Sequence, residues 1–117
     1  MKVIIAGSRT INDYTMVCHA VLRSGFSISR VLSGMAVGAD ALAIRYATEN
    51  GLPLDPYPAQ WSNWGRSAGH KRNVQMAHNA DGLIAVWDGQ SRGTQHMIYV
   101  AKARRLQVFV ALQSTDP

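Results

Sequence analysis

The sequence predicts a doubly wound α/β fold, in which five short strands form a mainly parallel sheet and helices cover both of its faces. Three observations lead to this prediction. Short apolar, β-branched runs recur along the chain, glycine-rich loops follow them, and the loops lead into segments whose apolar residues have helical spacing. Because crossovers between parallel strands are right-handed, few strand orders fit this alternation, and we expect the order 3-2-1-4-5.

Two strand–helix units occupy the first half of the chain. Residues 3–6 are apolar throughout, which is typical of a strand buried on both faces of a parallel sheet. A helix over residues 12–24 follows, with Asn12 or Asp13 as its N-cap. Residues 29–33 repeat the strand pattern and precede a second helix. The apolar face of that helix is formed by Ala39, Leu42, Ala43, Tyr46 and Ala47.

The second half begins with a weaker strand signal. Residues 52–57 contain Pro53 and Pro56, so a strand there belongs at a sheet edge, where missing N–H donors are tolerated. We expect a loop from Trp61 to Gly69 and then a helix over residues 70–79. The remaining expected elements are a strand at 83–87, a helix at 94–105 and a strand at 107–111.

The composition predicts a single domain over residues 1–112 and a loose tail at 113–117. The chain has 117 residues, of which 47% are apolar and 16% charged, and this length is typical of one hydrophobic core. Twelve Lys and Arg against seven Asp and Glu leave a net charge of +5. An anionic partner is therefore favoured over a cationic one.

The single cysteine, Cys18, cannot form an internal disulfide, which favours a reducing compartment. Cys18 has no basic neighbour in the sequence, so we interpret it as a buried small apolar residue rather than a nucleophile. The N-terminal apolar run is too short for a signal peptide, and no run approaches the roughly 18 residues that a membrane helix needs. We therefore expect a cytoplasmic protein without a membrane partner.

The loops after the strands are where a ligand is expected, because sheets of this kind bind ligands at the carboxyl ends of their strands. These loops carry glycines and small hydroxyl residues, and they precede helices whose first-turn N–H groups favour anions. Arg9 follows the first strand directly, and we expect Arg66, Lys71, Arg72 and Arg92 on the same rim. Several donors converging on one anion explain this pattern better than scattered solvated charges.

Other features around this edge are less specific. Neither GxGxxG nor GxxxxGK[ST] occurs, so a standard dinucleotide fold and a P-loop ATPase are not supported. Trp61 and Trp64 would either stack on a nucleobase or cover an edge of the core. Among the four histidines, His96 alone is expected near the pocket, and their spacing does not predict a metal site.

Four motifs together resemble the SLOG superfamily, which joins the DNA-processing protein DprA (Smf) to the Lonely-guy phosphoribohydrolases, and within it the small stand-alone YspA-like proteins of bacteria and phages. The resemblance covers about residues 2–111. It implies a Rossmann-like fold that binds a nucleotide or nucleotide-derived ligand at the carboxyl edge of the sheet. The motifs are Gly7-Ser8-Arg9, Ser33-Gly34 leading to Gly38-Ala39-Asp40-Ala41-Leu42-Ala43, Ala68-Gly69-His70-Lys71-Arg72-Asn73 with Met76, and Gly89-Gln90-Ser91-Arg92-Gly93-Thr94.

The Lonely-guy enzymes cleave an N-glycosidic bond with an arginine and a glutamate. The resemblance assigns the arginine to Arg72, because Met76 follows it at the family spacing, and it places Met97 where the glutamate would stand. A thioether can neither act as a base nor stabilise a developing positive charge. Asp40 and Asp88 are the nearest spare carboxylates in the sequence.

Three functions are compatible with these residues. The first is binding or sensing of an ADP-ribose-like phosphorylated ligand, with Asp40 on a ribose hydroxyl. The second is an N-glycosidase that uses Arg72 with Asp40 or Asp88. The third is single-stranded DNA binding, which the net charge of +5 permits but no basic stripe with interleaved aromatics supports. We expect no cofactor, no metal and a homodimer. The expected ligand-binding residues are Gly7, Ser8, Arg9, Gly34, Gly38, Asp40, Arg72, Asn73, Asp88, Ser91, Gly93 and Thr94.

Overall fold

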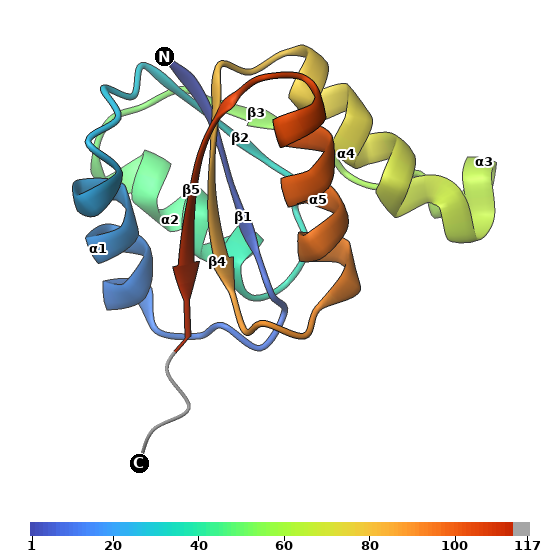
Figure 1. The fold of residues 1–117 in the computed structure, drawn as a ribbon, viewed down its shortest axis with the longest axis horizontal. Coiled ribbons are helices and arrows are strands. Elements are labelled where there is room, and N and C mark those ends of the chain that lie inside the picture. Colours follow the sequence, from blue (N-terminus) through green and yellow to red (C-terminus); the bar gives the residue numbers. More distant parts are fainter. Residues whose placement is uncertain (114–117) are drawn as a thin grey trace.

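The computed structural model describes residues 1–113, so the predicted tail at 113–117 lies outside the described residues except for Gln113. None of the described helices is both long and apolar enough to cross a membrane. Strands and helices alternate along most of the chain (Figure 1). The elements are β1 Lys2–Gly7, α1 Tyr14–Ser24, β2 Arg30–Ser33, α2 Ala39–Glu49, β3 Leu54–Pro56, α3 Trp61–Trp64, a 3₁₀ turn Gly65–Ser67, α4 Ala68–His78, β4 Gly82–Trp87, α5 Arg92–Ala103 and β5 Gln107–Leu112.

The five strands form one parallel sheet in the order β3-β2-β1-β4-β5, which confirms the predicted fold class and strand order. The central strand β1 places Ile4 beside Leu32 of β2 and Leu83 of β4. The three-residue strand β3 lies at the edge, as its prolines predicted. The chain runs outward from β1 to β3 and then returns to the other side of β1, so the strand order reverses between β1 and β4. Sheets of this kind bind ligands at that point.

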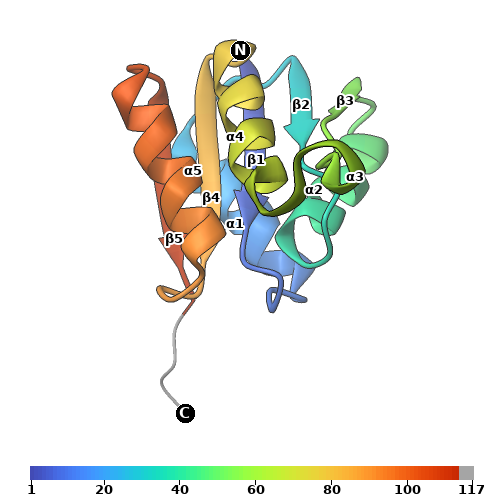
Figure 2. The same cartoon turned by 90° about the vertical axis from the view of Figure 1, so that its right-hand side faces the viewer.

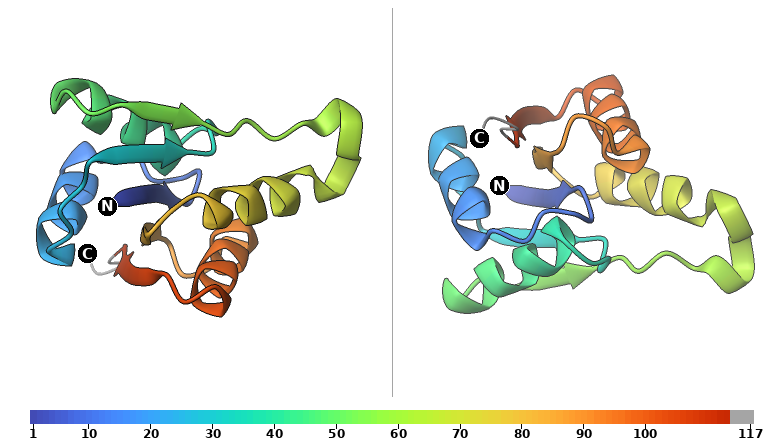
Figure 3. Two further views of the ribbon diagram at one scale, coloured as in Figure 1. Left: turned by 90° about the horizontal axis from the view of Figure 1, so that it is seen from above. Right: turned by 90° about the horizontal axis from the view of Figure 1, so that it is seen from below.

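Apolar side chains on the two faces of the sheet form two cores. Val3 and Ile5 of β1 pack with α1 and α2, whereas Ile4 packs with α4 and α5 on the opposite face. These three strand side chains are completely buried, which explains why residues 3–6 of β1 are all apolar instead of alternating with polar residues. Figure 2 shows α4 and α5 in front of the sheet, and Figure 3 shows the two helical layers from above and below.

The last helix, α5, begins earlier than predicted because Ser91 caps it. The hydroxyl of Ser91 accepts from the N–H of Thr94 at 3.5 Å, so the first helical residue is Arg92. The helix ends at Ala103, two residues before the predicted Arg105. The start of α5 consequently stands at the carboxyl edge of the sheet, on the same side as the loop after β1.

The stretch after Trp61, which we predicted to be a loop, is helical. α3 covers Trp61–Trp64, a 3₁₀ turn follows, and α4 begins at Ala68 rather than at His70. The loop prediction was wrong because α3 buries none of its residues, so no apolar periodicity marks it in the sequence. Figures 1 and 3 show α3 at the end of an arm that extends from the sheet.

Candidate functional site

A cleft of about 230 Å³ opens at the carboxyl edge of the sheet, beside the point where the strand order reverses. We call it the cleft. Its walls come from the end of β1, the starts of α2, α4 and α5, and the α3 arm. Segments far apart in the sequence therefore meet there. The sequence-predicted ligand residues in its lining are Gly7, Arg9, Asp40, Arg72, Asn73, Ser91, Gly93 and Thr94.

A second cavity of about 270 Å³ adjoins the cleft on the side of the loop after β2. Gly34, also a predicted ligand residue, lines this second cavity and not the cleft. Arg9, Ala36, Trp61 and Arg72 line both spaces. These four residues therefore form a shared wall between two adjoining cavities, an arrangement that the sequence alone did not predict.

Ser8 and Gly38 shape the backbone beneath the cleft and lie outside both linings. The buried Ser8 hydroxyl accepts from the N–H of Asp88 at 3.0 Å, and the Ser8 carbonyl oxygen accepts from the N–H of Ala39 at 3.2 Å. A Cβ on Gly38 would lie 2.5 Å from the backbone of Arg9, and its φ is 77°. Only glycine fits this close approach, which sets where Arg9 enters the cleft.

Asp88 holds the loop between β4 and α5 and also lies outside both linings. Its carboxylate accepts from the N–H groups of Gln90 and Ser91, each at 2.8 Å, and from the hydroxyl of Thr10 at 3.3 Å. The N–H of Ser91 is the main reason that the pKa of Asp88 is below its usual value, followed by that of Gln90. The structure thus places the Asp88 carboxylate in its own loop instead of in the cleft.

Asp40 is a buried carboxylate in the first turn of α2, with only 6% of its surface exposed. Its Oδ2 accepts from the N–H of Ala36 at 3.3 Å. Burial raises the pKa of Asp40, and the Arg72 guanidinium, the Ala36 N–H and Arg9 partly oppose this effect. Asp40 therefore lines the cleft as a strong acceptor whose charge is costly to keep without a ligand.

Arg72 is a half-buried cation on α4. Its Nη1 donates to the carbonyl oxygen of Gly34 at 2.6 Å, and its Nε donates to Oδ1 of Asn73 at 3.1 Å. Within residues 1–113 its Nη2 has no protein acceptor. Burial lowers the pKa of Arg72, Asp40 raises it and Arg9 lowers it further. The guanidinium is consequently held at Nη1 and Nε, and its Nη2 donors are left for a ligand.

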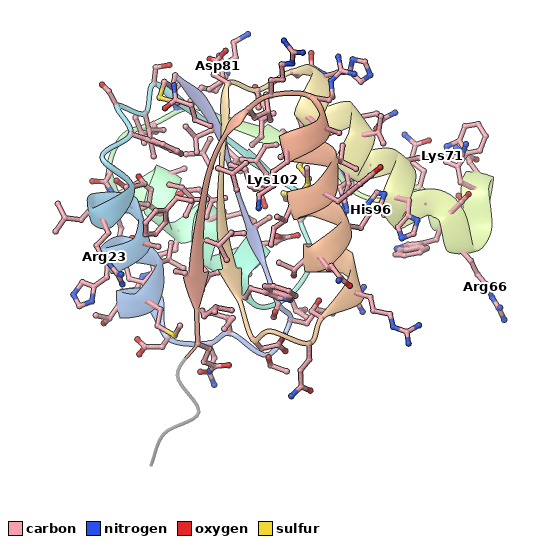
Figure 4. The ribbon with its side chains drawn as sticks, in the orientation of Figure 1. Arg23, Arg66, Lys71, Asp81, His96 and Lys102 are labelled. Carbon is pink, nitrogen blue, oxygen red and sulfur yellow. The ribbon has the colours of Figure 1, made fainter. Side chains whose placement is uncertain are left out.

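The basic residues of the rim do not all face the cleft. Arg9 and Arg66 line it and are exposed, and Figure 4 shows Arg66 on the arm. Lys71 instead lies over the ring of Trp64, with Nζ 4.4 Å from the ring centroid, so our placement of Lys71 on the rim is wrong. Consecutive residues of a helix point roughly 100° apart, so Lys71 points away from the cleft that Arg72 lines. Arg92 is exposed and lies outside both linings.

The start of α5 presents Ser91, Gly93 and Thr94 to the cleft. The Thr94 hydroxyl donates to the Ser91 hydroxyl oxygen at 3.2 Å, and both belong to the capping turn of the helix. Apart from the neighbouring residues and the backbone of α5 itself, no heavy atom lies within 4 Å of the position that a Gly93 Cβ would occupy. The backbone of the first turn is therefore open to a ligand, at the end of the helix where the dipole favours negative charge.

The two tryptophans of α3 have different surroundings. Trp61 lines the cleft and the second cavity, and it is 52% exposed. Trp64 lies on another face, where it borders a side groove with Val74 and carries Lys71 over its ring. Only Trp61 is thus placed to contact a ligand in the cleft, and neither indole is buried in the core.

Two histidines stack beside the cleft. The rings of His70 on α4 and His96 on α5 have centroids 3.9 Å apart and planes 14° apart. His70 lines the cleft, so our prediction that His96 alone lies near the pocket is wrong. This contact could not be predicted from the sequence because it joins residues 26 positions apart on two different helices. Figure 4 shows His96 on the side of α5 that faces α4.

The position at which the resemblance to the Lonely-guy enzymes places their glutamate is part of the core here. Met97 is 1% exposed and its side chain packs among the α4 and α5 residues at the base of the cleft. A carboxylate there would be desolvated, which agrees with a thioether at this position. Residues 1–113 contain no group of three or more His, Cys, Asp or Glu that could hold a metal ion. Cys18, predicted to be buried, is only partly buried in α1.

Comparison with known families agrees with this geometry. A sequence model of the YspA, cpYpsA-related SLOG family (YAcAr) matches residues 1–64, more than half of the chain. The protein belongs to this SLOG family. The matched part contains the loop with Arg9 and the start of α2 with Asp40, whereas Arg72 and the start of α5 lie beyond it. No curated protein matches the sequence. SLOG membership supports a nucleotide-related function at the level of the superfamily.

Proposed function

We propose that this SLOG protein binds a phosphorylated, nucleotide-derived ligand of the ADP-ribose type across the cleft and the second cavity. One observation carries the proposal. A Cβ on Gly34 would lie 2.5 Å from Nη1 of Arg72 and 2.7 Å from Oδ2 of Asp40. A buried acceptor for hydroxyl groups and a fixed donor for phosphate oxygens therefore stand side by side on the same wall, and a phosphorylated ribose needs both.

The phosphate groups would lie between Arg9, Arg72 and the first turn of α5. Arg72 keeps Nη2 free for an anion, and Arg9 contributes a second guanidinium from the loop after β1. The open backbone at Gly93 adds N–H donors at the positive end of the helix. Charge-assisted hydrogen bonds from fixed donors of this kind are the usual basis of phosphate affinity.

The two adjoining cavities favour a ligand with two parts. Arg9, Trp61 and Arg72 line both spaces, so a diphosphate beside the arginines would direct one nucleoside or ribose unit into each cavity. Trp61 would stack on a base, because half of its surface is exposed at this position. A mononucleotide would fill one cavity and leave the other to water.

A thermal-shift experiment with ADP-ribose, NAD, AMP and ribose 5-phosphate tests the proposed function. A ligand present at 100 times its dissociation constant stabilises the fold by about 2.7 kcal/mol, which raises the Tm of a domain of this size by roughly 10 °C. We expect ADP-ribose to give the largest shift and the Arg72→Ala variant to give a much smaller one. Equal Tm values with and without all four compounds would contradict the proposal.

Asp40 supports a second candidate, hydrolysis of an N-glycosidic bond. A carboxyl group whose pKa is raised by burial is suited to donate a proton to a departing base while water attacks the anomeric carbon. Chromatographic detection of the free base after incubation with NAD or AMP tests this activity. Ligand binding without base release would support the binding function alone, whereas release that is lost in Asp40→Asn would support the enzyme.

A further inference from the structure

Asn73 joins three partners at the edge of the cleft. It is buried, with 6% of its surface exposed, and its Oδ1 accepts from Nε of Arg72 at 3.1 Å. Its Nδ2 donates to the carbonyl oxygen of Gly93 at 3.3 Å and lies 3.1 Å from Nδ1 of His96. One amide group thus connects the cleft arginine on α4 with the histidine and the helix start of α5.

These partners fix the direction of every hydrogen bond. Turning the Asn73 amide over would place its NH₂ group against the Nε–H of Arg72 and its oxygen against the Gly93 carbonyl oxygen. Both contacts would be repulsive, so both Nδ2 hydrogens are donated, one to Gly93 and one to His96. Nδ1 of His96 must therefore be an unprotonated acceptor. The ring is neutral in this arrangement and carries its hydrogen on Nε2.

Within residues 1–113, the helices and strands that pack around His96 carry no carboxylate that would favour a second proton on its ring. The titratable or charged side chains on α4 are His70, Lys71, Arg72 and His78, and the one on α5 in the preceding turn is Arg92. The strands that pack on α5 carry only Lys2, at the amino end of β1. Burial lowers the pKa of His96, and the stacked His70 lowers it further.

Protonation of His96 would break this connection. A proton on Nδ1 would point at the NH₂ group of Asn73, so either the ring leaves or the amide turns over. A turned amide withdraws its oxygen from Arg72, which then loses the hydrogen bond on Nε. The guanidinium would be held by Gly34 alone, and the donors that face the cleft would no longer have a fixed direction.

We propose that His96 is a positioning residue that acts through Asn73 to hold Arg72, so that protonation of His96 weakens anion binding in the cleft. This regulation rests on the proposed function for its effect on ligand affinity. The connection among the three side chains exists without a ligand and can be measured without one. His96 needs no contact with the ligand for this role, and it does not line the cleft.

Nuclear magnetic resonance of the ligand-free protein, titrated from about pH 8 to about pH 5, tests the connection. We expect His96 in the Nε2–H form at high pH and an Arg72 Nε–H signal that shifts with the same midpoint as the His96 ring. In His96→Gln, whose amide oxygen replaces the acceptor at every pH, the Arg72 signal should not shift. The matched control His78→Gln, at the other end of α4, should behave as wild type. A His96 ring in the Nδ1–H form, or an Arg72 signal insensitive to the titration of His96, would overturn the proposal.

ADP-ribose binding measured over the same pH range tests the effect on affinity. The diphosphate of ADP-ribose gains no proton in this range, so a change in affinity reports on the protein. We expect affinity to fall at least about fivefold as His96 becomes protonated and to stay constant in His96→Gln. Affinity that rises on acidification would overturn the proposed regulation. If ADP-ribose does not bind at any pH, the proposed function fails, and the resonance titration still decides whether His96 positions Arg72.

Discussion

Arg72 donates from Nη1 to the carbonyl oxygen of Gly34, 38 residues earlier in the chain, at 2.6 Å. This hydrogen bond ties α4 to the loop after β2. It holds a half-buried guanidinium beside the buried carboxylate of Asp40, although the two side chains form no direct ion pair; within residues 1–113 ion pairs join Arg30 with Asp55 and Arg45 with Glu49. The space between the Arg72 guanidinium and the Asp40 carboxylate is open because Gly34 has no side chain.

Gly34→Ala should damage the site more than the fold. The added methyl group would lie 2.5 Å from Nη1 of Arg72 and 2.7 Å from Oδ2 of Asp40, so the guanidinium must move. We expect the free energy of unfolding to fall by about 1–3 kcal/mol, as in other overpacked sites, and ligand affinity to fall at least about tenfold. Urea denaturation and calorimetric titration measure the two effects. Unchanged affinity would mean that Arg72 need not occupy its present position.

Gly93→Ala should have opposite effects on stability and on binding. Outside α5 and the residues next to Gly93, nothing lies within 4 Å of the added methyl group in the ligand-free protein. Alanine also favours the helix, so stability should rise by up to about 1 kcal/mol. A phosphate group over the first turn of α5 would collide with that methyl group, and we expect affinity to fall by about tenfold. Greater stability together with wild-type affinity would show that the start of α5 does not contact the ligand.

Asp40→Asn should change how stability depends on pH. Burial raises the pKa of Asp40 above its ordinary value of 3.8, so the folded state favours the neutral carboxyl group. Asp40 therefore stabilises the wild type fully below the pKa of the unfolded chain, and this contribution is lost as the pH rises through the folded pKa. We expect Asp40→Asn to be more stable than wild type at pH 7, with a difference that disappears towards acidic pH. Urea denaturation across this range measures it; a variant less stable at pH 7 would contradict the reasoning.

The two tryptophans of α3 provide a matched comparison. Trp61 lines the cleft, whereas Trp64 faces the side groove and is covered by Lys71. Loss of a stacked base costs about 1–3 kcal/mol, so Trp61→Ala should weaken ADP-ribose binding by about tenfold or more. Trp64→Ala should leave binding within about twofold of wild type, because both indoles are half exposed and neither supports the core. Equal losses in both variants would point to a general effect on the arm.

The strand order and the location of the site could be predicted because each depends on local patterns. Buried parallel strands are apolar throughout, and the loops at their carboxyl ends meet at one edge whatever the side chains do. Arg72 and Asp40 were identified in this way. Ser8 and Asp88 belong to the same loops, yet they hydrogen-bond to each other beneath the cleft instead of lining it. The direction of a side chain within a loop is not encoded by its position in the sequence.

The contacts of the arm could not be predicted for a different reason. Whether Lys71 or Arg72 faces the cleft depends on the exact start of α4, and α3 buries no residue that would reveal where the helices begin. The stacking of His70 on His96 depends on how α4 and α5 lie against each other. The spacing of residues in the sequence predicts which of them share a face of one helix, but it does not predict which residues of two helices are in contact.

Calorimetric titration of ADP-ribose and of AMP into the wild type, Arg72→Ala and Arg104→Ala measures whether the cleft binds a phosphorylated nucleotide derivative through Arg72. Arg104 is an exposed arginine at the opposite end of α5 and controls for the loss of one positive charge. We predict that the wild type and Arg104→Ala bind ADP-ribose alike and more tightly than AMP, and that Arg72→Ala loses at least about 2 kcal/mol of binding free energy, or roughly thirtyfold in affinity. Equal binding by Arg72→Ala and Arg104→Ala, or no binding to the wild type, would contradict the claim that this cleft holds a phosphorylated nucleotide derivative.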